Sequence, residues 1–132
     1  MSFLEDNLEN LRKGFEGEEE VRKFFRSKGI KHMQVDLIFK YDGKYCLAEV
    51  KSQEKFLAPP FDGHGLPQWQ IDDRVKFYNS TGIEPFLIVK DPHDECLYIQ
   101  SIIKLLEGSK FSTKGSKPRV IFHIDSFKKI PL

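Results

Sequence analysis

The sequence predicts a mixed α/β domain, and three patterns indicate it. Residues 3–27 place apolar side chains on one helical stripe, residues 35–52 form two β-type runs around a turn signal, and residues 85–90 form a continuous apolar run after a second helical segment. A chain of 132 residues can bury one core without disulfides. We therefore expect a single domain over residues 1–132, with a central sheet flanked by the N-terminal helix on one side and a helix over residues 68–80 on the other.

The first helix is predicted over about residues 3–27, and Gly14 and Gly17 are positions where it could break. Glu18 lies in the middle of its apolar stripe, where an acid must be paired, hydrogen-bonded or bound to metal, or else become neutral. The alternative is that a break at Gly17 changes the helical phase and leaves Glu18 exposed. The stripe itself consists of Leu4, Leu8, Leu11, Phe15, Val21 and Phe25.

A β-hairpin is predicted over residues 35–52, which read VDLIFKYDGKYCLAEVKS. Asp42-Gly43 suits a two-residue type I′ turn, because both central residues of that turn have positive φ. With this turn Tyr41 pairs with Lys44, and counting outward sets the register of the two strands. A longer turn or a β-bulge would shift that register by one residue or more.

The register places Asp36 directly opposite Glu49, with Lys51 following on the same face. Two facing carboxylates destabilise a strand pair, so they need a compensating partner. A divalent cation such as Mg²⁺ is one, since it is typically held by one or two carboxylates together with water and phosphate oxygens. Lys51 would then put an ammonium group beside the metal, where it can offset charge on a reacting phosphorus centre. The alternative interpretation is a solvated strand pair whose charges face water.

The remaining elements follow in order. Residues 55–67 carry three prolines and two glycines and are predicted as a loop with a short edge strand at 56–58, in which His64 is a turn residue or, with Asp62, a contact for phosphate or metal. Helices are then predicted over residues 68–80 and 102–106, the second capped by Ser101. Strands are predicted over residues 85–90, 96–100 and 120–124.

Residues 109–119, SKFSTKGSKPR, contain four basic side chains and no acid. One interpretation is a solvated linker. The other is a loop that contacts phosphates, because sequence-independent phosphate contacts come from lysine, arginine, serine, threonine and backbone N–H groups. In that case Lys110, Lys114, Lys117 and Arg119 are its nucleic-acid contacts.

The bulk composition excludes several classes of protein. With 39% hydrophobic and 31% charged residues the chain is not globally disordered. Cys46 and Cys96 have no neighbouring ligand at metal spacing, so we expect buried free thiols rather than a disulfide or a zinc site. No apolar run approaches a membrane span, and the acidic start is unlike a signal peptide, so we expect a cytoplasmic protein without membrane contact.

Glu18, Asp36 and the run Glu49-Val50-Lys51 together resemble the PD-(D/E)xK nuclease superfamily. Residues 35–38 and 49–52 look most like those of small archaeal-type Holliday junction resolvases and related phage or virus nucleases. Val35 stands where the motif's name has proline, a position that varies. The resemblance implies a restriction-endonuclease-like core, in which a central mixed sheet is flanked by helices.

By the same resemblance, Asp36 and Glu49 are metal ligands assisted by the main-chain carbonyl of Val50. Lys51 is the catalytic lysine, and Glu18 binds metal directly or through water. The implied cofactor is Mg²⁺, with Mn²⁺ as a substitute.

The expected function is a Mg²⁺-dependent endodeoxyribonuclease that hydrolyses phosphodiester bonds, with a structure-specific, resolvase-like enzyme of DNA recombination as its sharper form. Ser52, Gln70 and Arg74 are predicted as further contacts with branched or duplex DNA. A homodimer is expected, because cutting two strands symmetrically needs two active sites. The alternatives are a non-catalytic nucleic-acid-binding or assembly module with the same fold, and a nuclease that cleaves single strands or RNA.

Overall fold

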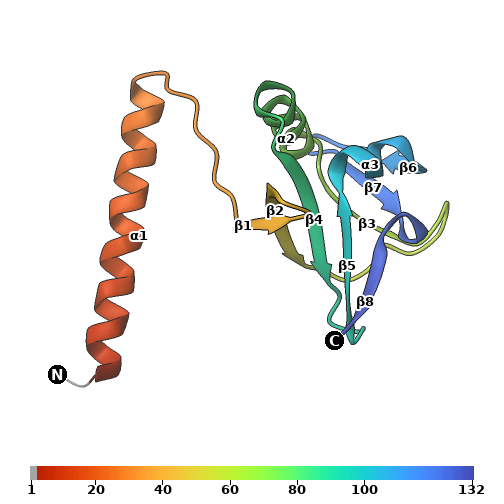
Figure 1. Cartoon of the computed structure of the whole chain (residues 1–132), viewed down its shortest axis with the longest axis horizontal. Coiled ribbons are helices and arrows are strands. Elements are labelled where there is room, and N and C mark those ends of the chain that lie inside the picture. The colour runs from red at the N-terminus through yellow and green to blue at the C-terminus, as the bar shows by residue number, and fades with distance from the viewer. Residues whose placement is uncertain (1–2) are drawn as a thin grey trace. The chain divides into compact units, whose positions relative to one another are not determined.

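The computed structural model describes residues 3–132 and divides the chain into two compact units, Met1–Gln34 and Val35–Leu132 (Figure 1). Each unit is compact through contacts among its own residues. The single domain expected from the sequence stays a prediction. Four members of the predicted apolar stripe have side chains outside the described residues: Leu4, Leu8, Leu11 and Phe15.

The first unit is built on one helix, α1 (Phe3–Ser27). The helix is continuous through Gly17, so the break that glycine allowed does not occur. It ends at Gly29, whose φ of 68° is the left-handed conformation typical of a helix C-terminus. The N–H of Ile30 then donates to the carbonyl of Phe25 at 2.9 Å, which satisfies one of the last carbonyls of the helix.

The second unit contains a five-stranded sheet in the order β1-β2-β4-β5-β8 (Figure 1). Strands β2 and β4 are parallel, and the other neighbours are antiparallel. The predicted mixed α/β class with a central mixed sheet is therefore confirmed, and the arrangement is consistent with a restriction-endonuclease-like core. The strands are β1 (Leu37–Tyr41), β2 (Lys44–Ser52), β4 (Glu84–Lys90), β5 (Cys96–Ser101) and β8 (Lys128–Pro131).

The hairpin of β1 and β2 has the predicted turn and register. Asp42 and Gly43 have φ values of 51° and 76°, as a type I′ turn requires. Tyr41 pairs with Lys44, and Leu37 pairs with Ala48 at the other end of the ladder. Asp36 immediately precedes the first residue of β1, so it lies beside the segment of β2 that begins at Glu49.

Two helices cover one face of this sheet. Helix α2 (Gln68–Thr81) packs on β4 and ends at Gly82, whose φ of 76° terminates it in the left-handed conformation. Helix α3 (Ile102–Glu107) packs on β4 and β5. The hydrophobic core is formed by these elements together with the second sheet, and it includes Ile71, Leu87, Val89, Ile102, Leu105, Val120 and Phe122.

A second, three-stranded sheet has the order β3-β7-β6, from β3 (Gly63–Pro67), β7 (Arg119–His123) and β6 (Lys110–Ser112). The prediction of a loop through residue 67 is therefore wrong. Gly65 lies so close to β7 that a Cβ atom on it would fall 1.9 Å from the carbonyl oxygen of Val120. The glycines of this segment allow close backbone approach rather than a turn.

Three further elements were absent from the sequence-based expectation, namely β6, the 3-10 helix η1 (Ile124–Ser126) and β8. Cys46 and Cys96 are buried free thiols, as expected. In the part of the chain that the structure describes, no helix has the length and apolarity needed to span a bilayer.

Candidate active site

Asp36 is held against the backbone of β2. Its Oδ2 atom accepts a hydrogen bond of 2.8 Å from the N–H of Val50, the residue between Glu49 and Lys51. Within residues 3–132 the second carboxylate oxygen, Oδ1, has no hydrogen-bond partner. The structure thus brings Asp36 to the Glu49-Val50-Lys51 run, as the hairpin register predicted.

Glu49 lies on the buried face of β2, and its side chain is hydrogen-bonded to α2. Gln70 donates from Nε2 to Oε2 at 2.7 Å, and Arg74 donates from Nε to Oε1 at 2.8 Å. A second nitrogen of Arg74, Nη2, also contacts Oε1. Residues four apart share one face of a helix, which is why Gln70 and Arg74 reach the same carboxylate. The charge of Glu49 is compensated by Arg74 inside the fold.

Gln70 and Arg74 were predicted to contact nucleic acid. Their exposed fractions are only 7% and 3%, and both side chains are directed at Glu49. Neither therefore lies on a surface that nucleic acid reaches in this conformation, which is at odds with the contact predicted for them. Their spacing on α2 was the signal for a buried role, because it matches that of the inward-facing Ile71 and Val75.

Lys51 follows Glu49 on the same face of β2 and is partly buried. Within the described residues its ammonium group makes no hydrogen bond or ion pair, so its charge is not committed to a structural partner. Ser52 is the last residue of β2 and is exposed. Whether Lys51 and Ser52 contact a phosphate stays a prediction.

Glu18 belongs to the other compact unit, on α1. Its side chain is 62% exposed, and Oε2 lies 3.6 Å from Nη1 of Arg22 one helical turn later. Glu18 is thus paired with a residue of its own helix. The break at Gly17, which was the alternative reason for an exposed Glu18, does not occur, since α1 is continuous there. A metal contact of Glu18 stays a prediction, because the two units are described separately. Within the second unit, the candidate site consists of Asp36, Glu49 and Lys51.

The donor set at this site fits a hard cation. Asp36 and Glu49 offer carboxylate oxygens and Val50 a carbonyl oxygen, which are the ligand types that Mg²⁺ prefers. No group of three or more histidine, cysteine, aspartate or glutamate side chains suitable for a metal occurs in the described residues. Two carboxylates suffice for Mg²⁺, because water and substrate oxygens complete its coordination. Oε2 of Glu49 accepts one hydrogen bond, from Gln70, and so retains a lone pair for a metal ion, whereas Oε1 already accepts from two nitrogens of Arg74.

The basic segment 109–119 is a β-hairpin rather than an unstructured linker. The N–H of Thr113 donates to the carbonyl of Arg119 at 2.8 Å, and the hairpin turns around Gly115, whose φ is 126°. Lys110 donates from Nζ to the carbonyl of Leu106 at 2.8 Å at the end of α3. Lys114 and Lys117 are exposed near the turn. Whether this hairpin binds phosphates stays a prediction.

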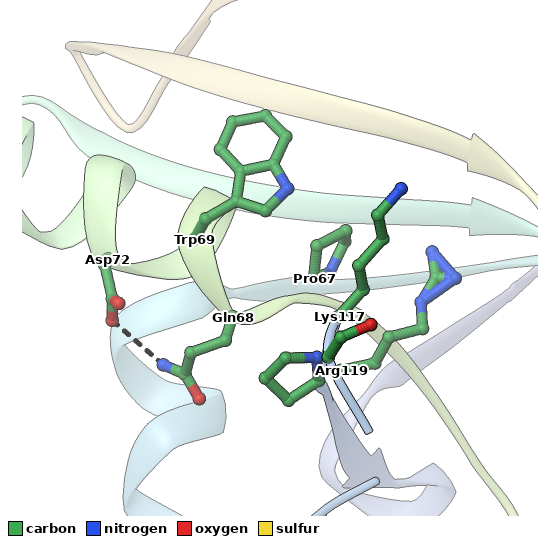
Figure 2. A pocket seen from close by; sticks show the side chains of 8 residues that line it. Pro67, Gln68, Trp69, Asp72, Lys117 and Arg119 are labelled. Atoms are coloured by element: carbon green, nitrogen blue, oxygen red, sulfur yellow. Dashed lines mark hydrogen bonds between the residues drawn. The ribbon is translucent and has the colours of Figure 1, made fainter. Parts of the chain in front are cut away.

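A pocket of about 610 Å³ lies where this hairpin meets the start of α2 (Figure 2). Trp69 lines it and is 65% exposed, although tryptophan is usually well covered in a fold. The sequence analysis missed this residue. The available signal was that the chain's only tryptophan comes directly after Pro67-Gln68, in the first turn of a predicted helix.

His64 is fully buried in β3 and is neither a turn residue nor part of the site. Its Nδ1 atom lies 3.1 Å from Oε1 of Gln53, and its Nε2 atom lies 3.7 Å from Oδ2 of the buried Asp91. Burial lowers the pKa of His64, and the carboxylate of Asp91 partly opposes that shift. The hydrogen bond to Gln53 links β3 to the residue that follows β2.

Comparisons with known proteins find similarity among solved structures. No protein-family model matches the chain, and no curated protein matches it. Among solved structures, the chain is similar to Hjc of Archaeoglobus fulgidus, a Holliday junction resolvase from an archaeal hyperthermophile. The TM-score is 0.44 and the identity 15%, over 70% of this chain and 74% of that chain. A likeness this distant does not assign the chain to a family or an activity.

Proposed function

We propose that this protein is a Mg²⁺-dependent endonuclease that hydrolyses phosphodiester bonds in DNA. The observation that supports the proposal best is the bond from the Val50 N–H to Asp36, which holds one carboxylate beside Glu49 and Lys51. Two carboxylates and an uncommitted ammonium group on adjoining segments suit the hydrolysis of an anionic phosphodiester. The PD-(D/E)xK pattern of the sequence is in keeping with this chemistry.

Each residue has a role in this proposal. Asp36, Glu49 and the carbonyl of Val50 would hold the metal ion, which when bound supplies Lewis-acid polarisation of the phosphate and a more acidic water. Lys51 stabilises the negative charge that develops on the phosphate oxygens. Gln70 and Arg74 fix the carboxylate of Glu49 from behind, as hydrogen-bonding partners of a metal ligand commonly do.

The substrate side of the proposal is DNA, with branched DNA as the sharper form. Lys114 and Lys117 offer charges for sequence-independent phosphate contacts, and Ser52 adds a hydroxyl at the end of β2. Symmetric cutting of two strands needs two active sites, so we also propose a homodimer. Light scattering that gives a monomer both with and without DNA would remove the symmetric, resolvase-like form and favour a nicking or RNA-cleaving enzyme.

A second candidate is a non-catalytic nucleic-acid-binding or assembly module. The ion pair between Glu49 and Arg74 favours it, because that pair explains a buried carboxylate without any metal. In this case Glu49 is a structural residue, and Asp36 simply satisfies the backbone of Val50.

A cleavage assay on end-labelled substrates separates the two candidates. Linear duplex, single strand, flap, four-way junction and RNA are incubated side by side with Mg²⁺, with Mn²⁺ and with a chelator. The nuclease cleaves at least one DNA substrate only when metal is present, and Lys51→Met abolishes that cleavage without loss of binding. Binding without cleavage of any substrate supports the module instead.

A further inference from the structure

The pocket beside α2 combines an exposed aromatic ring with two apolar walls. Trp69 forms one side of it (Figure 2), and Pro67 and Pro118 line it from two different segments of the chain. These segments are joined by a hydrogen bond of 3.0 Å from the N–H of Gln68 to the carbonyl of Pro118. This bond ties the start of α2 to the segment that leads into β7.

Charge is separated within this pocket. Figure 2 shows Lys117 and Arg119 on one side and Asp72 on the other, with Asp72 accepting a hydrogen bond of 2.9 Å from Gln68. An anion is attracted to the first side and repelled from the second. A ligand that fits both sides of the pocket would carry a negative group beside Lys117 and Arg119. Its other end would be a flat polar group.

Arg119 lines the pocket and brings its positive charge to it. Its Nε atom is buried and, within the described residues, has no hydrogen-bond partner, so the terminal nitrogens of the guanidinium are the donors that a ligand in the pocket would meet. A phosphate oxygen is a suitable acceptor, because arginine binds phosphate through charge-assisted hydrogen bonds.

We propose that this pocket binds one unpaired nucleotide, with its base stacked on Trp69 and its phosphate held by Lys117 and Arg119. Stacking needs an open base face, which a nucleotide inside a duplex does not offer. The inference rests on the proposed DNA-directed function and narrows its substrate class to DNA that contains unpaired nucleotides, such as a single strand, a flap or an opened junction.

The pocket is connected to the candidate active site through α2. Trp69 directly precedes Gln70, whose side-chain amide donates to Glu49 at 2.7 Å. The first turn of α2 therefore presents Trp69 to the pocket and Gln70 to the carboxylate. A nucleotide stacked on Trp69 would be bound by the same helical turn that supports the site.

The chain's single tryptophan makes this proposal directly measurable. Tryptophan fluorescence is recorded during two titrations, both in the presence of a chelator. One adds an oligothymidine single strand, and the other adds a duplex of equal length whose two ends are closed by ligation. Fluorescence polarisation of a labelled copy of each DNA reports binding independently. We expect saturable quenching by the single strand and none by the closed duplex.

Variants locate the effect. Trp69→Ala should weaken single-strand binding by about 5- to 150-fold, since a stacked base contributes about 1–3 kcal/mol, whereas Trp69→Phe should keep most of the affinity. Arg119→Gln should weaken binding of the same strand. Tyr45→Ala is the matched control, because Tyr45 is also an exposed aromatic, at 63%, but does not line the pocket.

Two results would overturn the proposal. In the first, the polarisation assay shows single-strand binding while the tryptophan fluorescence stays unchanged. In the second, the Trp69→Ala variant binds the single strand as tightly as the wild type does. Because the titration is done without metal, it does not depend on cleavage. Failure of the nuclease proposal is seen separately, as an absence of metal-dependent cleavage in a protein whose fluorescence is still quenched.

Discussion

Glu49 of β2 and Arg74 of α2 form an ion pair whose two side chains are 5% and 4% exposed. Arg74 Nε lies 2.8 Å from Oε1 of Glu49, and Gln70 completes the carboxylate's hydrogen bonds. The pair fixes the strand that carries the candidate site against the helix that carries the pocket. Because Arg74 already compensates its charge, Glu49 is either a structural residue only or a residue that also binds metal.

Removing Arg74 should strongly destabilise the fold. Arg74→Met leaves the buried carboxylate of Glu49 without its counter-charge, a loss that typically costs about 3–5 kcal/mol. Urea denaturation measures the free energy of unfolding, and Lys76→Met, an exposed change on the same helix, is the control. The double variant Glu49→Gln/Arg74→Met should lose less than the sum of the single changes. A loss below about 1 kcal/mol for Arg74→Met would contradict a buried, functioning pair.

Metal should stabilise the Arg74→Met variant more than the wild type. Without the guanidinium, a cation at Asp36 and Glu49 becomes the only compensation for the buried charge, and a ligand of the folded state raises its stability. The measurement is the melting temperature with and without millimolar Mg²⁺ or Mn²⁺. Arg74→Met/Asp36→Asn should lose the extra shift. If metal leaves the melting temperature of all three proteins unchanged, Glu49 is only a structural partner of Arg74.

Acidification should weaken the fold through His64. Burial holds the pKa of His64 below its usual 6.5, so the unfolded chain takes up a proton that the folded chain refuses. The contribution of His64 is thus complete above pH 6.5 and is lost as pH falls from there toward its lowered folded pKa. Denaturation midpoints across this range should show the loss in the wild type and a flatter profile in His64→Gln.

His93 provides the control for that titration because its effect has the opposite sign. Its hydrogen bond to Glu54, at 2.9 Å, raises the pKa of His93, so its contribution is present below 6.5 and is lost as pH rises. His93→Gln should therefore retain the acid-induced loss. A His64→Gln profile as steep as that of the wild type would show that another group is responsible.

The hairpin was predictable because its determinants are local. Asp42-Gly43 dictates a two-residue turn, and that turn alone sets the register that brings Asp36 to Glu49. The helix over residues 68–80 and its glycine terminus follow from the same kind of local rule. These parts of the fold and the place of Asp36 could be predicted from the residues themselves.

The parts that could not be predicted depend on contacts between distant segments. Gly63 and Gly65 resemble a turn in the sequence, and only the close approach of β7 shows why a strand there needs glycine. Arginine is usually exposed, and the burial of Arg74 depends on its pairing with Glu49, 25 positions away. Trp69 acquires its pocket from Lys117 and Arg119 at the far end of the chain.

Neutralising the exposed lysines of the β6–β7 hairpin should weaken DNA binding about equally for all sequences. Each phosphate contact releases counterions, so Lys114→Gln/Lys117→Gln should lower the salt dependence of duplex binding by up to about 2 in the log–log slope. Adding Lys110→Gln should change the slope less, because Lys110 already caps α3. Lys104→Gln, an exposed change on α3, is the control. An unchanged affinity and slope would make the hairpin a structural connection only.

The central claim is that Asp36, Glu49 and Lys51 form a metal-dependent hydrolytic site, and the substitution Asp36→Asn tests it most directly. The asparagine side chain can still accept the hydrogen bond from the Val50 N–H, so the fold should be kept while the negative charge is lost. The measurement is the initial rate of DNA cleavage in Mg²⁺ and in Mn²⁺, beside the melting temperature and DNA affinity of the same preparations. We predict a loss of cleavage of about 100-fold or more, with the melting temperature in a chelator and the DNA affinity unchanged. Cleavage by Asp36→Asn at the wild-type rate, or wild-type cleavage that persists in a chelator, would contradict the claim.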